Sequence, residues 1–126
     1  MKIITVLAAT FGLAIGIATA RTAAQTPAPA APPDPAKVAA GKLVYDTQKC
    51  ATCHAIDKVG GKLASDLKGV GTRVTPEDLK KWFTNTVDME KKLAKKPTMP
   101  MSNWLKTHKQ TDPDIELLVA YMRSLK

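Results

Sequence analysis

Cys50 and Cys53 are separated by two residues, and His54 follows directly. They are the only two cysteines in the 126-residue chain. The C-x-x-C-H spacing is typical of c-type haem attachment. Thiols about one helical turn apart can both form thioethers with the vinyl groups on one edge of a haem, and the next imidazole then binds the iron as proximal ligand. The motif therefore predicts a chain that folds around one covalently bound haem c.

Other uses of two cysteines fit this sequence less well. A disulfide across so short a loop would be strained. A thioredoxin-like motif belongs in a βαβ unit, and the chain has no β-rich segments. A zinc site needs four ligands, and the chain could offer the motif residues together with His108. The adjacent Cys53 and His54 are poorly placed to bind one tetrahedral ion. The sequence favours haem attachment over these three alternatives.

The N-terminus has the pattern of an export signal. Lys2 precedes an uncharged stretch, residues 3–18, and Ala18-Thr19-Ala20 matches an A-x-A cleavage site. The uncharged run extends to residue 20, which is at the lower limit for a membrane-spanning helix. We therefore predict that residues 1–20 are a signal peptide or an N-terminal anchor. The protein is expected to be exported to the periplasm, either soluble or tethered to the membrane.

Composition divides the remaining chain into a linker and one domain. Residues 21–36 are rich in alanine and proline and lack bulky apolar side chains, so they predict an extended linker. Residues 37–126 form the predicted monohaem domain. A core of this size is marginal without help, and a buried haem would supply apolar volume.

The charge balance indicates the kind of partner. The chain has 19 basic and 11 acidic residues, a net charge of +8. Nucleic acid is one partner for a basic protein, but export and the haem motif argue against it. We expect redox proteins with acidic docking surfaces, approached by a monomer. The densest basic cluster comprises Lys91, Lys92, Lys95 and Lys96, although an ordinary solvated helix face would look the same.

Helix signals predict an all-α fold. A capping residue precedes proline at Pro35, Pro76 and Pro113, which marks three helix starts. The predicted helices cover residues 35–49, 76–86 and 113–125, with a short helix over 88–95. Residues 60–61 and 69–71 are glycine-rich and predict loops. Loops this long need something to pack on, which a haem would provide.

Gly41 and Tyr45 precede the haem motif, and Leu118 and Tyr121 lie in the last predicted helix. In this order the chain resembles a class I monohaem cytochrome c. The resemblance implies three main helices, a short helix and long loops around one haem. It also implies that Gly41 and Tyr45 contact Leu118 and Tyr121 where the first and last helices cross, and that Tyr45 lies near the haem.

The family often carries Gly-Pro-x-Leu-x-Gly-x-x-x-Arg, and here the matching stretch runs from Ala64 to Arg73. The family's proline carbonyl accepts the ring N–H of the proximal histidine. Ser65 replaces that proline; its carbonyl could still accept this bond, but the rigidity of proline is lost. The resemblance places Arg73 near a haem propionate, with a surface arginine as the alternative.

The resemblance also indicates the sixth iron ligand. The family's ligand methionine is usually followed by proline, which favours Met99; Met101 and His108 are the alternatives. Trp82 and Trp104 each have an indole N–H that could reach a propionate, and plain packing would suit them equally. Residues 104–110 could form a partner-facing loop.

Together these features predict a one-electron carrier rather than an enzyme. The chain has no G-x-S-x-G, H-E-x-x-H or P-loop motif. The alternatives are a haem-bearing subunit of a dehydrogenase or oxidase, a small haem peroxidase, or a gas sensor. A peroxidase or sensor would need an open or displaceable sixth position.

Overall fold

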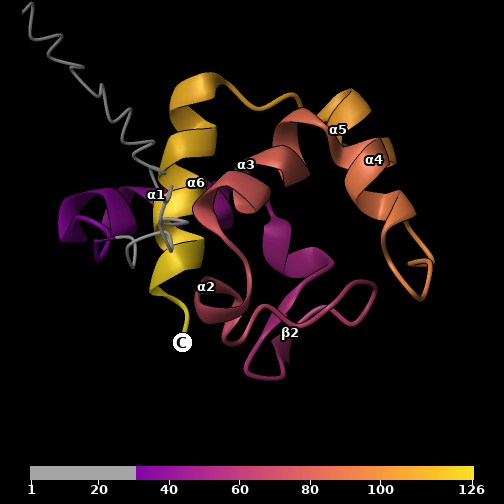
Figure 1. Ribbon diagram of the computed structural model, residues 1–126, viewed down its shortest axis with the longest axis horizontal. Coiled ribbons are helices and arrows are strands. Elements are labelled where there is room, and N and C mark those ends of the chain that lie inside the picture. The colour runs from indigo at the N-terminus through magenta and orange to yellow at the C-terminus, as the bar shows by residue number, and fades with distance from the viewer. Residues whose placement is uncertain (1–30) are drawn as a thin grey trace, which may run out of the picture. The chain divides into compact units, whose positions relative to one another are not determined.

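The computed structural model describes residues 31–126, so the predicted signal or anchor and most of the predicted linker lie outside the described residues. The elements follow one another in the order α1 (Pro35–Thr47), a 3-10 turn η1 (Cys50–Thr52), β1 (Ala55–Ile56), β2 (Val59–Gly60), α2 (Val70–Arg73), α3 (Pro76–Thr84), α4 (Thr86–Lys91), α5 (Met101–Thr107) and α6 (Asp112–Ser124) (Figure 1). The helical fold expected from the sequence is confirmed.

Side-chain caps start the three long helices. Asp34 accepts a hydrogen bond from the backbone N–H of Ala36 at 2.8 Å, and Thr75 Oγ1 accepts one from Asp78 at 3.1 Å. The cap of α6 is Thr111, whose Oγ1 accepts from Asp114 at 3.3 Å. The predicted cap Asp112 was therefore wrong by one residue. These caps satisfy N–H groups that have no partner within their own helix.

The first and last helices cross in close contact (Figure 1). A Cβ atom on Gly41 would lie 2.0 Å from the carbonyl oxygen of Leu117, so only glycine permits this approach. Beside it the rings of Tyr45 and Tyr121 lie 5.5 Å apart between centroids and 60° between planes, a tilted arrangement that aromatic pairs favour. The predicted contact between these two helices is confirmed.

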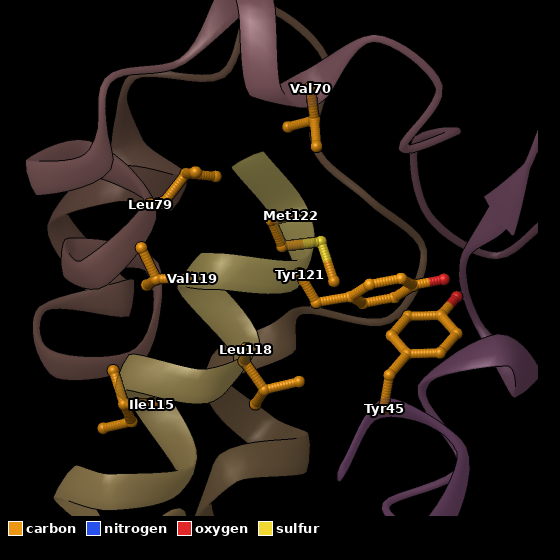
Figure 2. Close-up of a cluster of buried hydrophobic side chains, with 8 residues drawn as sticks. All are labelled: Tyr45, Val70, Leu79, Ile115, Leu118, Val119, Tyr121 and Met122. Atoms are coloured by element: carbon orange, nitrogen blue, oxygen red, sulfur yellow. The ribbon is translucent and has the colours of Figure 1, made fainter. Parts of the chain in front are cut away.

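The hydrophobic core forms around α6. Its cluster draws residues from α1, α2, α3 and α6 (Figure 2): Tyr45, Val70, Leu79, Ile115, Leu118, Val119, Tyr121 and Met122. The prediction of a loop at 69–71 was wrong, because Gly69 caps the short helix α2 with φ of 67°. A Cβ on Gly71 would lie 2.4 Å from the Arg123 carbonyl oxygen, so this glycine lets α2 pack directly on α6.

Two further elements differ from the sequence prediction. The short antiparallel hairpin β1–β2 pairs Ala55 with Gly60 and Ile56 with Val59. Its two-residue turn, Asp57-Lys58, has φ of 52° and 68°. Such turns usually carry Asn-Gly or Asp-Gly, so the hairpin has no clear signal in the sequence. The expected loop over 104–110 is largely helical, because α5 extends to Thr107.

The other helix ends differ by a few residues. α1 stops at Thr47, since Lys49 adopts a left-handed φ of 58° that leads into the 3-10 turn. The short helix predicted over 88–95 begins at Thr86 and ends at Lys91. Within residues 31–126, no helix combines the length and apolar character needed to cross a membrane.

Candidate functional site

A cavity of about 680 Å³ brings together the predicted site residues. Ligand pockets in proteins typically enclose roughly 300–1,000 Å³, so its size suits a large cofactor. The predicted residues that line it are Tyr45, Cys50, Cys53, His54, Arg73, Trp82 and Met99. Met101 and Trp104 line it as well, whereas His108 does not. Side chains far apart in the sequence therefore converge on one space.

The C-x-x-C-H motif forms a tight turn at this cavity. The backbone N–H groups of Cys53 and His54 both donate to the Cys50 carbonyl, at 3.2 and 3.0 Å. Both cysteines are half-buried free thiols in the structure, standing in for the thioether sulfurs of a haem-bound chain. Burial raises the pKa of the Cys50 thiol to about 11, so this thiol is neutral near pH 7.

His54 is oriented by one hydrogen bond. Its Nδ1 lies 2.9 Å from the carbonyl oxygen of Ser65. A carbonyl oxygen can only accept, so Nδ1 carries the ring proton and donates it to Ser65. In a neutral imidazole with this tautomer, Nε2 is the nitrogen with the lone pair that an iron ligand requires. Ser65 thus supplies the carbonyl expected from the family's proline.

Tyr45 supports the same histidine through the backbone. Its hydroxyl donates to the His54 carbonyl at 3.3 Å, and its side chain is buried in the core. Burial raises the pKa of the Tyr45 phenol to about 12, so this group remains a neutral donor over the physiological range. Tyr45 links the α1–α6 crossing to the motif.

Arg73 and Trp82 also line the cavity. Arg73 Nε donates to the Gly69 carbonyl at 3.2 Å, and Nη2 donates to the Lys68 carbonyl at 2.7 Å. The backbone therefore holds the guanidinium, which has further N–H groups for an anion. Trp82 is half-buried on α3.

Two of the methionines that line the cavity lie at or just before the start of α5, and a third, Met122, lies on α6. Met99 is 48% exposed, and Met101 is the half-buried first residue of α5. Both side chains offer a thioether to the same space. Met89 and Met122 are buried, and Met122 belongs to the hydrophobic core cluster.

A carboxylate that the sequence did not reveal fastens this loop. Glu90 accepts from the Ser102 backbone N–H at 2.8 Å and from the Ser102 hydroxyl at 2.7 Å. The first turn of α5 has no side-chain cap at its own N-terminus, so Glu90 replaces it from α4. No local motif signals the pairing, because twelve residues separate the partners.

Trp104 and His108 form a stacked pair on α5. Their rings lie 4.3 Å apart between centroids and 4° between planes. His108 is exposed and outside the cavity lining, so the structure gives no support for it as an iron ligand. Trp104 therefore both lines the cavity and stacks on His108.

The lysines that line the cavity differ from the other lysines in their ion pairing. The four lysines that line it are Lys49, Lys62, Lys95 and Lys96. Within residues 31–126, none of these four forms an ion pair, whereas the five ion-paired lysines lie away from the lining: Lys42, Lys68, Lys80, Lys81 and Lys91. Two carboxylates, Asp66 and Glu90, also line the cavity. Uncompensated positive charge therefore gathers at this site.

The residues present fit a haem. Two thiols and an imidazole with a free Nε2 come from the motif, and Met99 and Met101 offer a further ligand. The rest of the lining is mainly apolar, including Leu63, Leu67, Val70, Val74, Leu79, Phe83, Leu93 and Leu118. In the part of the chain that the structure describes, no three His, Cys, Asp or Glu side chains cluster as a metal site would need.

Comparison with known proteins agrees with this geometry. The family model for cytochrome c matches residues 38–126, more than half of the chain. No curated protein and no solved structure matched in the two other comparisons. The matched region contains the motif, the methionine loop and the last helix, and the chain therefore belongs to the cytochrome c family.

Proposed function

We propose that this protein is an electron carrier that transfers one electron at a time between redox proteins outside the cytoplasm. Members of the cytochrome c family hold haem c covalently and serve haem-based electron transfer. The observation that carries the proposal is that one cavity is lined both by the C-x-x-C-H motif and by Met99 and Met101. A carrier needs both axial positions filled by the protein, and this cavity offers both kinds of ligand.

Each group has a separate task. Cys50 and Cys53 would hold the haem through thioethers, while His54 Nε2 and the Met99 sulfur would bind the iron. A haem held in this way supplies one electron by cycling between Fe(II) and Fe(III). Because both axial ligands belong to the chain, neither has to leave during transfer, and little reorganises. The apolar lining excludes water, which disfavours the more charged ferric state.

We favour Met99 over Met101 as the ligand. Met99 precedes Pro100 in the loop before α5, whereas Met101 already belongs to α5, where its backbone is fixed. A thioether is a soft ligand that favours ferrous iron and raises the reduction potential. Arg73 and Trp82 would lie near the haem's polar edge.

Docking would use the lysines around the cavity. Lys49, Lys62, Lys95 and Lys96 have no acidic partner among residues 31–126, so their charge is available to an acidic surface on a redox partner. Charge of this kind speeds encounter more than it tightens the complex. The proposed carrier is a monomer in the periplasm, with residues 1–20 as its export signal or membrane anchor.

The test is the electronic spectrum of the ferric holoprotein, with Met99→Ala and Met101→Ala as matched variants. The wild type and Met101→Ala should show a methionine–iron charge-transfer band, and Met99→Ala should lose it and bind carbon monoxide readily when reduced. A band that survives in Met99→Ala and disappears in Met101→Ala would move the ligand to Met101. A high-spin ferric wild type would overturn the carrier and favour a peroxidase or gas sensor.

A further inference from the structure

Residues 64–67 pair with residues 53–55 and contain one residue more than that segment. The backbone N–H of Ala64 donates to the Cys53 carbonyl at 3.0 Å, and that of Leu67 donates to the Ala55 carbonyl at 2.8 Å. His54 lies alone between the two acceptors, whereas Ser65 and Asp66 both lie between the two donors. The chain must therefore bulge at these two residues, where the Ser65 carbonyl meets His54.

The Asp66 side chain occupies this bulge as a three-way anchor. Its Oδ1 accepts from the backbone N–H groups of Asp57 and Lys68 at 3.1 and 2.8 Å, and its Oδ2 accepts from Lys58 at 2.8 Å. Asp57 and Lys58 form the left-handed turn of the hairpin, so their N–H groups point to a common acceptor. Asp66 thus ties the bulge to the hairpin that follows His54.

The electrostatics agree with this geometry. Hydrogen bonds from the backbone N–H groups of Lys68 and Lys58 lower the pKa of Asp66, because they stabilise the charged carboxylate. Asp66 therefore remains ionised and accepts all three bonds at neutral pH.

We propose that Asp66 is a positioning residue that holds the Ser65 carbonyl on His54 Nδ1 and thereby lowers the reduction potential of the bound haem. The anchor replaces the rigidity that a proline at position 65 would give. A firm Nδ1–H···O=C bond makes the imidazole a stronger donor to iron, and stronger donation favours the ferric state. The inference rests on the proposed function only in taking His54 as the proximal ligand.

The test uses the holoprotein with Asp66→Ala, Asp66→Asn and the control Asp57→Asn. Asp57 lies in the same hairpin, and within residues 31–126 its carboxylate accepts a hydrogen bond only from Lys68 Nζ, at 2.7 Å. Asparagine suits the left-handed backbone at position 57. The control therefore measures what the loss of one nearby negative charge does by itself.

Two readouts separate positioning from general stability. The first is the reduction potential, and the second is the rate at which the His54 Nδ1 proton exchanges with solvent in the ferrous protein, followed by NMR. Beyond the shift of Asp57→Asn, Asp66→Ala should move the ferric–ferrous equilibrium about threefold to tenfold toward ferrous, or roughly 30–60 mV at 59 mV per tenfold change for one electron. The Nδ1 proton should exchange at least about tenfold faster, as expected when a hydrogen bond worth about 1.4 kcal/mol is lost.

Asp66→Asn should give a smaller shift in the same direction, since its amide oxygen can still accept from Asp57 and Lys68. This variant carries the test if Asp66→Ala does not accumulate with haem. A potential no higher than that of Asp57→Asn, together with unchanged Nδ1 exchange, would overturn the proposal in either variant. A failure of Met99 ligation would instead appear in the wild-type spectrum, and the effect of the Asp66 variants on Nδ1 exchange would still be seen.

Discussion

The two sides of the cavity are built in different ways. The proximal segment, residues 50–68, is held by a dense set of main-chain bonds: Gly61 donates to the Ala51 carbonyl at 2.8 Å, beside the bonds of Ala64 and Leu67. The distal loop, residues 92–100, has no backbone N–H from 94 to 99 that donates to another residue of 31–126. Its ends are tied instead, by α4 and by the Glu90–Ser102 contact. The fold therefore sets His54 in place directly, whereas it sets the methionine through the loop's ends.

Gly61→Ala should break the proximal side most severely. A Cβ on Gly61 would lie 2.0 Å from the Thr52 carbonyl oxygen and 2.8 Å from the Cys53 nitrogen. Both neighbours are backbone atoms of the haem motif, so they cannot rotate away. We expect a loss of about 3 kcal/mol in unfolding free energy, measured by chemical denaturation.

The matched substitution on the distal side is Thr98→Ala. Thr98 is exposed. We expect this substitution to change the unfolding free energy of the protein by no more than about 0.5 kcal/mol. Equal effects at the two positions would show that the two sides are equally rigid.

Glu90→Ala should loosen the distal loop while leaving the proximal segment intact. It removes both hydrogen bonds to Ser102, and bonds to a charged acceptor are worth about 1.5–3 kcal/mol. We expect a stability loss of about 2 kcal/mol and faster carbon monoxide binding to the ferrous protein. Glu77→Ala, at an exposed position in the first turn of α3, is the control and should change neither. If carbon monoxide binding were unchanged in Glu90→Ala, Glu90 would not be what holds the loop in place.

Tyr45 allows a test by pH on the proximal side. Burial raises the pKa of its phenol to about 12 in the folded protein, against about 10 in an unfolded chain. The folded state therefore binds this proton more tightly, so its contribution to stability is fully present below pH 10 and is lost as pH rises toward 12. Thermal melts of the wild type should show that decline, and Tyr45→Phe should reduce it. An identical decline in both would assign it to other groups.

The lysines around the cavity should give the smallest effect. Oxidation of the ferrous protein by ferricyanide, a small anion, should slow as salt rises, because salt screens the attraction. In the double variant Lys95→Ala/Lys96→Ala, the oxidation rate should depend on salt concentration a few fold less steeply. Lys80→Ala/Lys81→Ala removes two lysines that are ion-paired and outside the lining, and should alter it less. A flat wild-type profile would contradict docking by charge.

Much of the fold could be predicted because its signals are local. Pro35, Pro76 and Pro113 mark helix starts, and the spacing of Gly41 and Tyr45 marks the face that meets α6. The spacing of Cys50, Cys53 and His54 was enough to predict them as haem-binding residues. The resemblance to cytochrome c then supplied the crossing of the first and last helices.

The missed features depend on contacts between distant residues. Glu90 and Ser102 are twelve positions apart, and Asp66 binds Asp57 from nine positions away. The hairpin turn at Asp57-Lys58 lacks glycine, and Asp66 compensates by accepting both of its N–H groups. Short elements such as α2 and α5 form because they pack on or tie to their neighbours, which no short stretch of sequence reveals.

Proton NMR of the ferrous holoprotein tests the central claim most directly, namely that His54 and Met99 bind the iron from a fixed proximal side and a looser distal side. A methionine methyl group that lies over the face of the haem is strongly shielded by the ring current. We predict one such methyl resonance, present in the wild type and in Met101→Ala and absent in Met99→Ala. A wild-type spectrum without a shielded methionine methyl would contradict the claim.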